Sequence, residues 1–144
     1  MSANPRHRAA ALAPLLLAAC TAGPAPLPAA NPPQPDTPLA ERAAILGGFL
    51  RAALLCGQPV SATAQDRAAA IEAAALDLRQ RQGGTAARDA FLRALQPPAF
   101  DPRRQGRDRD AWCARQRPDI RRVAAWLDSE EGAAFAAQAE AARR

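Results

Sequence analysis

The chain has 144 residues, of which 49% are hydrophobic, but 40 of those hydrophobic residues are alanine. This length fits one small domain, and the lack of a glycine repeat excludes a collagen-like structure. All 19 basic residues are arginine, and with 14 acidic residues they give a net charge of +5. Such a charge is compatible with nucleic acid binding, but the N-terminal residues argue against a nucleic acid partner.

The first twenty residues have the pattern of an export signal. Arg6, His7 and Arg8 form a positive region, and residues 9–19 form an apolar stretch around Leu15 and Leu16. A helix needs about 20 apolar residues to cross a bilayer, so these eleven are too few for a membrane anchor. The pattern therefore predicts a signal peptide over residues 1–19.

The apolar stretch ends in Leu17-Ala18-Ala19-Cys20. These four residues resemble the lipobox of bacterial lipoproteins. The resemblance implies that diacylglycerol is attached to the Cys20 thiol, that the signal is cleaved before Cys20, and that the lipid holds the chain on a membrane. Thr21 stands where retained inner-membrane lipoproteins often carry aspartate, so the expected location is the outer membrane, facing the periplasm. The alternative is an ordinary signal peptide with an unrelated cysteine.

Residues 20–38 have the composition of a linker. Seven prolines lie between residues 22 and 38, and proline fixes φ and removes backbone donors. We therefore expect an extended, lipidated tether, in which residues 22–38 span up to about 50 Å at ~3.1 Å per residue. The alternative is a proline-rich ligand for another protein. Residues 39–144 then form the folded periplasmic domain.

Helical patterns and helix breakers predict an all-α domain of four to five helices. The first helix opens at Thr37-Pro38 and ends before Gly57 and Pro59, and its apolar residues at helical spacing are Ile45, Phe49, Ala52, Ala53 and Cys56. Its Gly47-Gly48 pair either weakens the helix or lets another helix approach. The second runs over about 63–82, capped by Thr63, with Ala68, Ile71, Ala75 and Leu78 on its apolar side.

The remaining helices are separated by glycine, proline and cap residues. Gly83-Gly84 end the second helix, and the third buries Phe91, Leu92 and Leu95 before Pro97-Pro98. The fourth starts near Arg107, and Pro118 must kink it or begin another helix. Its apolar side is Trp112, Gln116, Ile120, Val123 and Leu127. Asp128 or Ser129 caps the last helix, whose large apolar residue is Phe135.

The cysteine count predicts a covalent link in this thin core. Leu, Ile, Val and Phe make up only 18% of residues 39–144, a fraction at which disorder becomes plausible. If Cys20 carries lipid, Cys56 and Cys113 form an even pair in an oxidising compartment, which favours a disulfide between them. Two buried free thiols are the alternative. A redox-active pair is disfavoured because Cys-X-X-Cys spacing is missing.

The residue types left after the signal limit the chemistry. His7 is the only histidine, and the chain after residue 20 has no histidine, lysine, tyrosine or methionine. This argues against histidine-based nucleophile pairs, Schiff-base lysines and the usual zinc sites. We expect no enzyme, cofactor or metal. The nearest carboxylate pairs, Asp108 with Asp110 and Glu130 with Glu131, leave a peptidoglycan hydrolase as a weak third hypothesis.

Arginines are concentrated between Asp101 and Arg122, a segment that contains eight arginines and four aspartates. Because arginine binds phosphate and carboxylate groups bidentately, they are candidate anion-binding residues. Their positions are Arg103, Arg104, Arg107, Arg109, Arg115, Arg117, Arg121 and Arg122. A solvated helix face with pairs such as Arg115–Asp119 is the alternative. Trp112 and Trp126 fit core packing better than a binding platform.

A second resemblance covers a few dozen scattered positions of the folded part. Leu55-Cys56-Gly57, Trp112-Cys113 and the segment from Val123 to Leu127 resemble small uncharacterised helical exported proteins of proteobacteria, which implies fold and compartment only. The leading hypothesis is a non-catalytic envelope lipoprotein, an accessory or assembly factor that binds another envelope protein through a helical face. The alternative is a binder of anionic envelope lipid or glycan, including peptidoglycan, through the arginines.

Overall fold

The computed structural model describes residues 38–144 and consists of helices joined by short loops. The α-helices are α1 (Leu39–Leu55), α2 (Ala62–Ala94), α3 (Arg107–Asp128) and α4 (Glu130–Ala141), and a 3-10 turn, η1, spans Pro102–Arg104. No strand occurs in these residues, so the all-α prediction is confirmed. The expected signal peptide, Cys20 and almost all of the tether lie outside the described residues.

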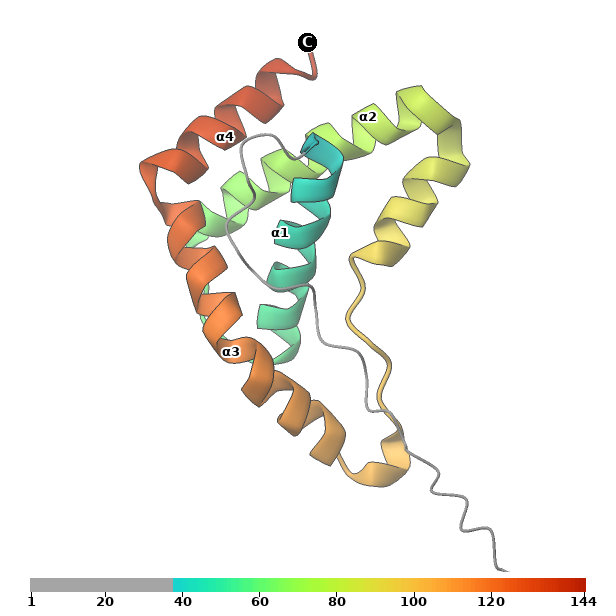
Figure 1. Cartoon of the computed structure of the whole chain (residues 1–144), viewed down its shortest axis with the longest axis vertical. Helices are drawn as coiled ribbons and strands as arrows, with labels where there is room; N and C mark the ends of the chain where they lie inside the picture. Colours follow the sequence, from blue (N-terminus) through green and yellow to red (C-terminus); the bar gives the residue numbers. More distant parts are fainter. Residues whose placement is uncertain (1–37) are drawn as a thin grey trace, which may run out of the picture.

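Helix α1 lies in the middle of the domain (Figure 1). Helix α3 runs along one side of α1, and the last part of α2 lies on the other, while the first part of α2 and α4 run in a similar direction in the upper half of this view. The C-terminus ends α4 at the top. Helix α1 therefore packs against α2 and α3, and α4 packs against the same two helices.

Helix α2 turns sharply at Gly83 and Gly84, where the sequence predicts a helix end. Gly83 has φ −146° and Gly84 has φ +63°, and neither is helical. A positive φ is easily adopted by glycine, which has no Cβ. The turn divides α2 into a first arm, residues 62–82, and a second arm, residues 85–94, which folds back toward α1 (Figure 1).

Several helix ends differ from the predicted ones. Helix α1 begins after Pro38, whose carbonyl accepts from the next turn, with no side-chain cap; Thr37 lies outside the described residues. Helix α2 begins earlier than expected, because Ser61 accepts from the Ala64 N–H at 3.0 Å and takes the role predicted for Thr63. Of the two cap candidates for α4, Ser129 is the one used.

Helix α3 passes through Pro118 as a single element, so the proline does not begin a new helix. Its side chain is exposed, on the side of α3 that faces away from the packed residues. The five residues predicted for the apolar side of this helix are all buried. The helical period in the sequence therefore placed the packed face of α3 correctly.

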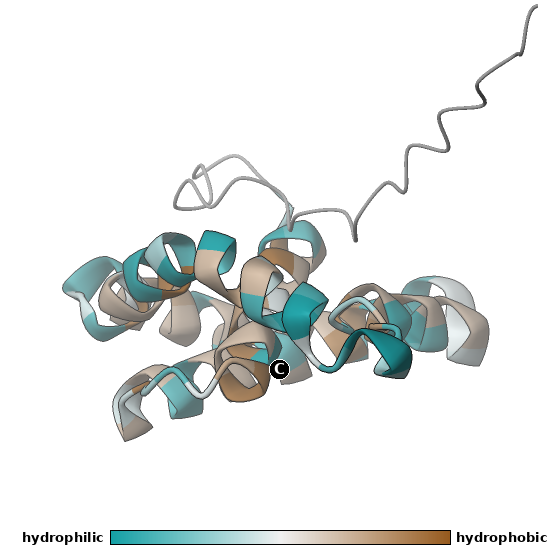
Figure 2. Ribbon diagram, turned by 90° about the horizontal axis from the view of Figure 1, so that it is seen from below, coloured by the Kyte–Doolittle hydropathy of each residue, from teal (hydrophilic) through white to brown (hydrophobic). Residues whose placement is uncertain are grey.

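The core contains more small side chains than large ones. Alanines alternate with a few large residues, and the largest of the fully buried side chains are Trp112, Phe49, Leu46, Ile71, Leu95 and Leu127. Hydrophilic residues lie mostly on the outer sides and ends of the helices, and the more hydrophobic stretches lie mostly where the helices meet (Figure 2). Within residues 38–144, no helix has the length and apolar content that a membrane crossing requires.

A disulfide joins Cys56, at the end of α1, to Cys113, in the second turn of α3, with a Cα–Cα distance of 5.5 Å. This confirms the pairing predicted from the cysteine count. It closes a loop of 57 residues in sequence separation that contains all of α2. The disulfide thus fixes α3 against the end of α1.

Candidate functional site

A mainly apolar surface pocket lies between the C-terminal half of α1 and the start of α2, and we call it the α1–α2 groove. Its volume is about 310 Å³. Its lining comes from both helices and from the loop that joins them. The lining residues are Leu50, Arg51, Ala53, Leu54, Gln58, Val60, Gln65, Ala69 and Glu72.

Leu54 is the most exposed large apolar side chain in residues 38–144, with 84% of its surface accessible. It is followed by Leu55 at 36%. The packed side of α1 holds Phe49, Ala52 and Ala53, and Leu54 follows directly after them, so the helical period turns it away from the core. Leu54 thus adds exposed apolar surface to the edge of the groove, whose lining it shares with Leu50 and Val60.

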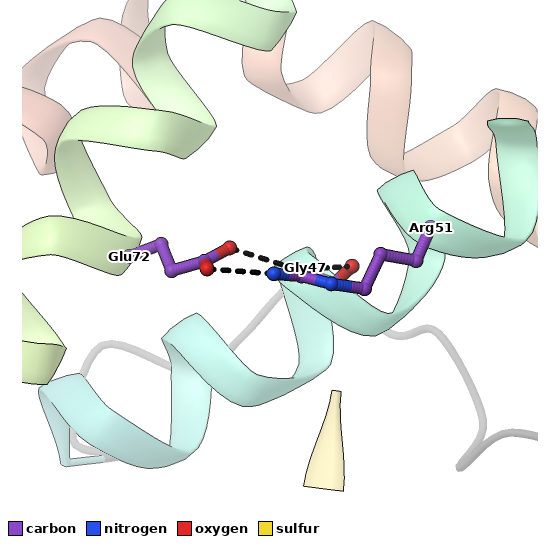
Figure 3. Close-up of polar contacts among 3 residues, drawn as sticks. All are labelled: Gly47, Arg51 and Glu72. Atoms are coloured by element: carbon purple, nitrogen blue, oxygen red, sulfur yellow. Dashed lines mark hydrogen bonds and ion pairs between the residues drawn. The ribbon is translucent and has the colours of Figure 1, made fainter. Parts of the chain in front are cut away.

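One wall of the groove carries an ion pair between the two helices. The Arg51 guanidinium donates to both carboxylate oxygens of Glu72, at 2.7 and 2.8 Å, and to the Gly47 carbonyl at 3.3 Å (Figure 3). The hydrogen bond to Glu72 raises the pKa of Arg51, against the opposing effect of burial. Bidentate pairing is the strongest arginine–carboxylate geometry, so these charges neutralise each other within the groove wall.

Gly47 is placed where a side chain would disturb this wall. A Cβ at Gly47 would lie 3.0 Å from Leu95 Cδ2, 3.1 Å from the Arg51 guanidinium and 3.2 Å from the Glu72 carboxylate. The second of the two readings of the Gly47-Gly48 pair is therefore confirmed at Gly47, because the end of α2 approaches α1 there. A larger residue at position 47 would therefore push against both partners of the ion pair and against Leu95.

A second pocket lies beside the disulfide, between the end of α1 and the first half of α3, and we call it the disulfide pocket. Its volume is about 390 Å³, and its lining is more polar than that of the groove. Leu55, Cys56 and Gly57 form one wall. The lining residues from α3 are Arg109, Asp110, Cys113 and Arg117.

The eight arginines of the predicted cluster do not form one surface. By helical period, Arg115 and Arg122 share one flank of α3, and Arg117 and Arg121 share the other. Arg122 pairs with Asp119 at 3.3 Å, so the pair expected for Arg115 is made by a different arginine. Within residues 38–144, the side chains of Arg115, Arg117 and Arg121 make no ion pair or hydrogen bond.

The four remaining arginines lie around η1 and the first turn of α3. Arg104 pairs with Asp108 at 3.0 Å, and the Arg107 Nε donates to the Arg104 carbonyl at 3.4 Å. Arg109 reaches Asp110 at only 3.5 Å, and Arg103 is exposed. Two arginines of the predicted cluster, Arg109 and Arg117, therefore meet at one pocket, the disulfide pocket.

The carboxylates considered for hydrolysis make local contacts on the surface. Asp108 and Asp110 form ion pairs with neighbouring arginines, and Glu131 accepts a hydrogen bond from the Trp126 indole N–H at 3.2 Å.

Both tryptophans pack against the core as predicted, because Trp112 is fully buried and Trp126 lies against Phe135. No group of three or more potential ligand side chains in residues 38–144 could hold a metal ion.

The groove was missed by sequence reasoning, although one signal pointed to it. The predicted apolar side of α1 leaves Leu50 and Leu54 on another side, and two leucines outside a packed face indicate a second apolar surface. The Arg51–Glu72 pair gave no such signal because its residues are 21 positions apart.

Comparison with known protein families, curated proteins and solved structures found no match to this chain.

Proposed function

We propose that this chain is a non-catalytic lipoprotein of the cell envelope that binds another envelope protein through the α1–α2 groove. Acylation at Cys20 and the outer-membrane location follow from the lipobox resemblance and are part of the proposal. The tether of residues 20–38 then carries the helical domain into the periplasm. The domain acts as an accessory or assembly factor that holds a partner near the membrane.

The observation that supports the proposal most is Leu54, an 84% exposed leucine at the edge of the mainly apolar α1–α2 groove. Exposed apolar surface costs free energy in water, and a partner that covers it recovers about 25 cal/mol per Å². The polar groups near it are already occupied in part: Gln58 donates to the Cys56 carbonyl and Gln65 to the Val60 carbonyl. The side-chain oxygens of Gln58 and Gln65 can accept hydrogen bonds from a partner.

These lining groups define the partner's chemistry. A segment that presents an aliphatic or aromatic side chain to Leu50 and Leu54, with amide N–H groups toward Gln58 and Gln65, fits the groove. A charged segment does not fit, because Arg51 and Glu72 neutralise each other in the wall. Binding through this groove should therefore change little when salt is raised to about 0.5 M, a concentration that screens surface charges strongly.

The test uses the full chain in its own cells with a photo-crosslinking residue at position 54. A matched chain carries the same residue at Ala134, which is exposed on α4 and lies outside the groove. We expect a defined protein adduct from position 54, none from position 134, and loss of the adduct when Leu50→Ser is added. Equal adducts from both positions would contradict a groove-specific partner.

The membrane part of the proposal has its own measurement. Mass spectrometry of the chain purified from membranes should give an N-terminal peptide that begins at Cys20 and carries the mass of the added acyl groups. The Cys20→Ser variant serves as the control and should remain unacylated. A mature chain with an unmodified Cys20 would overturn the lipoprotein assignment while leaving the groove proposal intact.

A further inference from the structure

The disulfide pocket has a second kind of chemistry, which is independent of the proposed protein partner. Arg109, Cys113 and Arg117 follow one another at intervals of four residues, so all three side chains leave α3 on the same side. The two arginine Cα atoms are about 12 Å apart at 1.5 Å per residue. The disulfide lies between them and ties this side of α3 to Cys56.

The fold does not use these two guanidinium groups to complete the end of α1. The Ala52, Ala53 and Leu54 carbonyls accept backbone N–H groups from Cys56, Gln58 and Gly57, at 2.8 to 3.2 Å. Backbone donors thus already serve the last turn of α1.

Arg109 and Arg117 also make few ion pairs or hydrogen bonds with other side chains. Arg117 has no polar partner in the part of the chain that the structure describes. Arg109 has only the 3.5 Å contact to Asp110, and this distance is beyond the usual range for a hydrogen bond between nitrogen and oxygen. Both cations remain able to bind an anion in the pocket.

We propose that the disulfide pocket binds a phosphate group between Arg109 and Arg117. A tetrahedral phosphate has oxygens in several directions, so guanidinium groups from opposite sides can each donate to different oxygens, whereas a planar carboxylate matches one arginine fork. The group can belong to a lipid headgroup or to a soluble phosphate. Asp110, on the pocket wall, opposes binding through like-charge repulsion.

The experiment follows the arginine Nε–H signals of the full chain by NMR at low salt, with Cys20→Ser present throughout so that the protein is unacylated. The probes are inorganic phosphate and dihexanoyl phosphatidylglycerol below its micelle concentration. We expect saturable shifts of the Arg109 and Arg117 signals. Tighter binding of phosphate indicates a soluble source, and tighter binding of the lipid indicates a headgroup; both outcomes support the site.

Charge-matched variants separate the pocket from general surface attraction. Arg117→Gln should weaken binding about tenfold, which corresponds to loss of one charge-assisted contact. Arg115→Gln removes the same charge from the other flank of α3 and should change the dissociation constant less than about twofold. Asp110→Asn should tighten binding about twofold to threefold.

Two results would overturn the proposal. One is shifts that fail to saturate with either probe, because a defined site must fill. The other is an equal loss from Arg115→Gln and Arg117→Gln, which would assign the attraction to the net charge of the helix. Because Leu54 and the groove take no part in this site, neither result bears on the protein-binding proposal.

Discussion

The α1–α2 groove and the disulfide pocket each contain arginine, but in opposite circumstances. In the groove, Arg51 is less than one-third exposed and makes a bidentate pair with Glu72, so its charge is used within the fold. In the disulfide pocket, Arg117 is exposed and has no polar partner within residues 38–144. Whether an arginine stabilises the fold or is available to bind a ligand therefore depends on whether a carboxylate of the fold already pairs with it.

The two regions also differ in what holds their walls together. In the groove wall, a non-covalent ion pair joins α1 to α2, and Leu95 approaches Gly47 closely beside it. The disulfide pocket is held by one covalent bond between Cys56 and Cys113. The covalent bond should therefore contribute more to stability than the ion pair.

Removing the disulfide should destabilise the domain more than breaking the groove ion pair. The double variant Cys56→Ser and Cys113→Ser should lower the free energy of unfolding by about 4 kcal/mol, because a loop of this length gains chain entropy when it is released in the unfolded state. Urea unfolding of the wild type with and without reductant measures this. The double variant is the control, since reductant should not change it. Identical unfolding of oxidised and reduced wild type would contradict the prediction.

Breaking the groove ion pair should have an intermediate effect. Arg51→Gln leaves the partly buried Glu72 carboxylate without its partner and should cost about 1–2 kcal/mol, between the values for surface and buried pairs. Arg117→Gln is the matched control, because it removes an exposed arginine with no partner and should cost less than about 0.5 kcal/mol. Urea unfolding of Arg51→Gln, Glu72→Gln and the double variant gives the coupling energy directly. A coupling near zero would mean that the pair does not stabilise the groove.

The features predicted correctly from sequence are those that local pattern or counting determines. Glycine and proline mark the helix ends at Gly57 and at Gly83-Gly84 because backbone conformation is a local property. The packed side of α3 followed from its helical period. The Cys56–Cys113 pair followed from parity, once Cys20 was set aside for lipid, and needed no knowledge of the packing.

The groove could not be predicted because it depends on which parts of the chain meet. Nothing in the residues around Arg51 indicates that Glu72 lies opposite, or that Leu95 returns to Gly47 after the turn in α2. The arginine cluster shows the converse, because closeness in sequence does not place these residues on one surface. Eight residues that are neighbours in sequence separate onto different sides of α3 and η1, and only the packing of α3 against the end of α1 shows that Arg109 and Arg117 share a pocket.

The smallest stability effect is expected at Leu54, and it distinguishes a binding residue from a core residue. Leu54→Ser should change the free energy of unfolding by less than about 0.5 kcal/mol, because the side chain is 84% exposed. Leu46→Ala, on the same helix but only 1% exposed, should cost about 2–5 kcal/mol as a core truncation. Urea unfolding of both variants tests the contrast. If Leu54→Ser proved as costly as Leu46→Ala, Leu54 would support the fold, and the groove would lose the residue on which its proposed function depends. A stable Leu54→Ser variant that no longer recovers its envelope partner would assign the exposed leucine to binding.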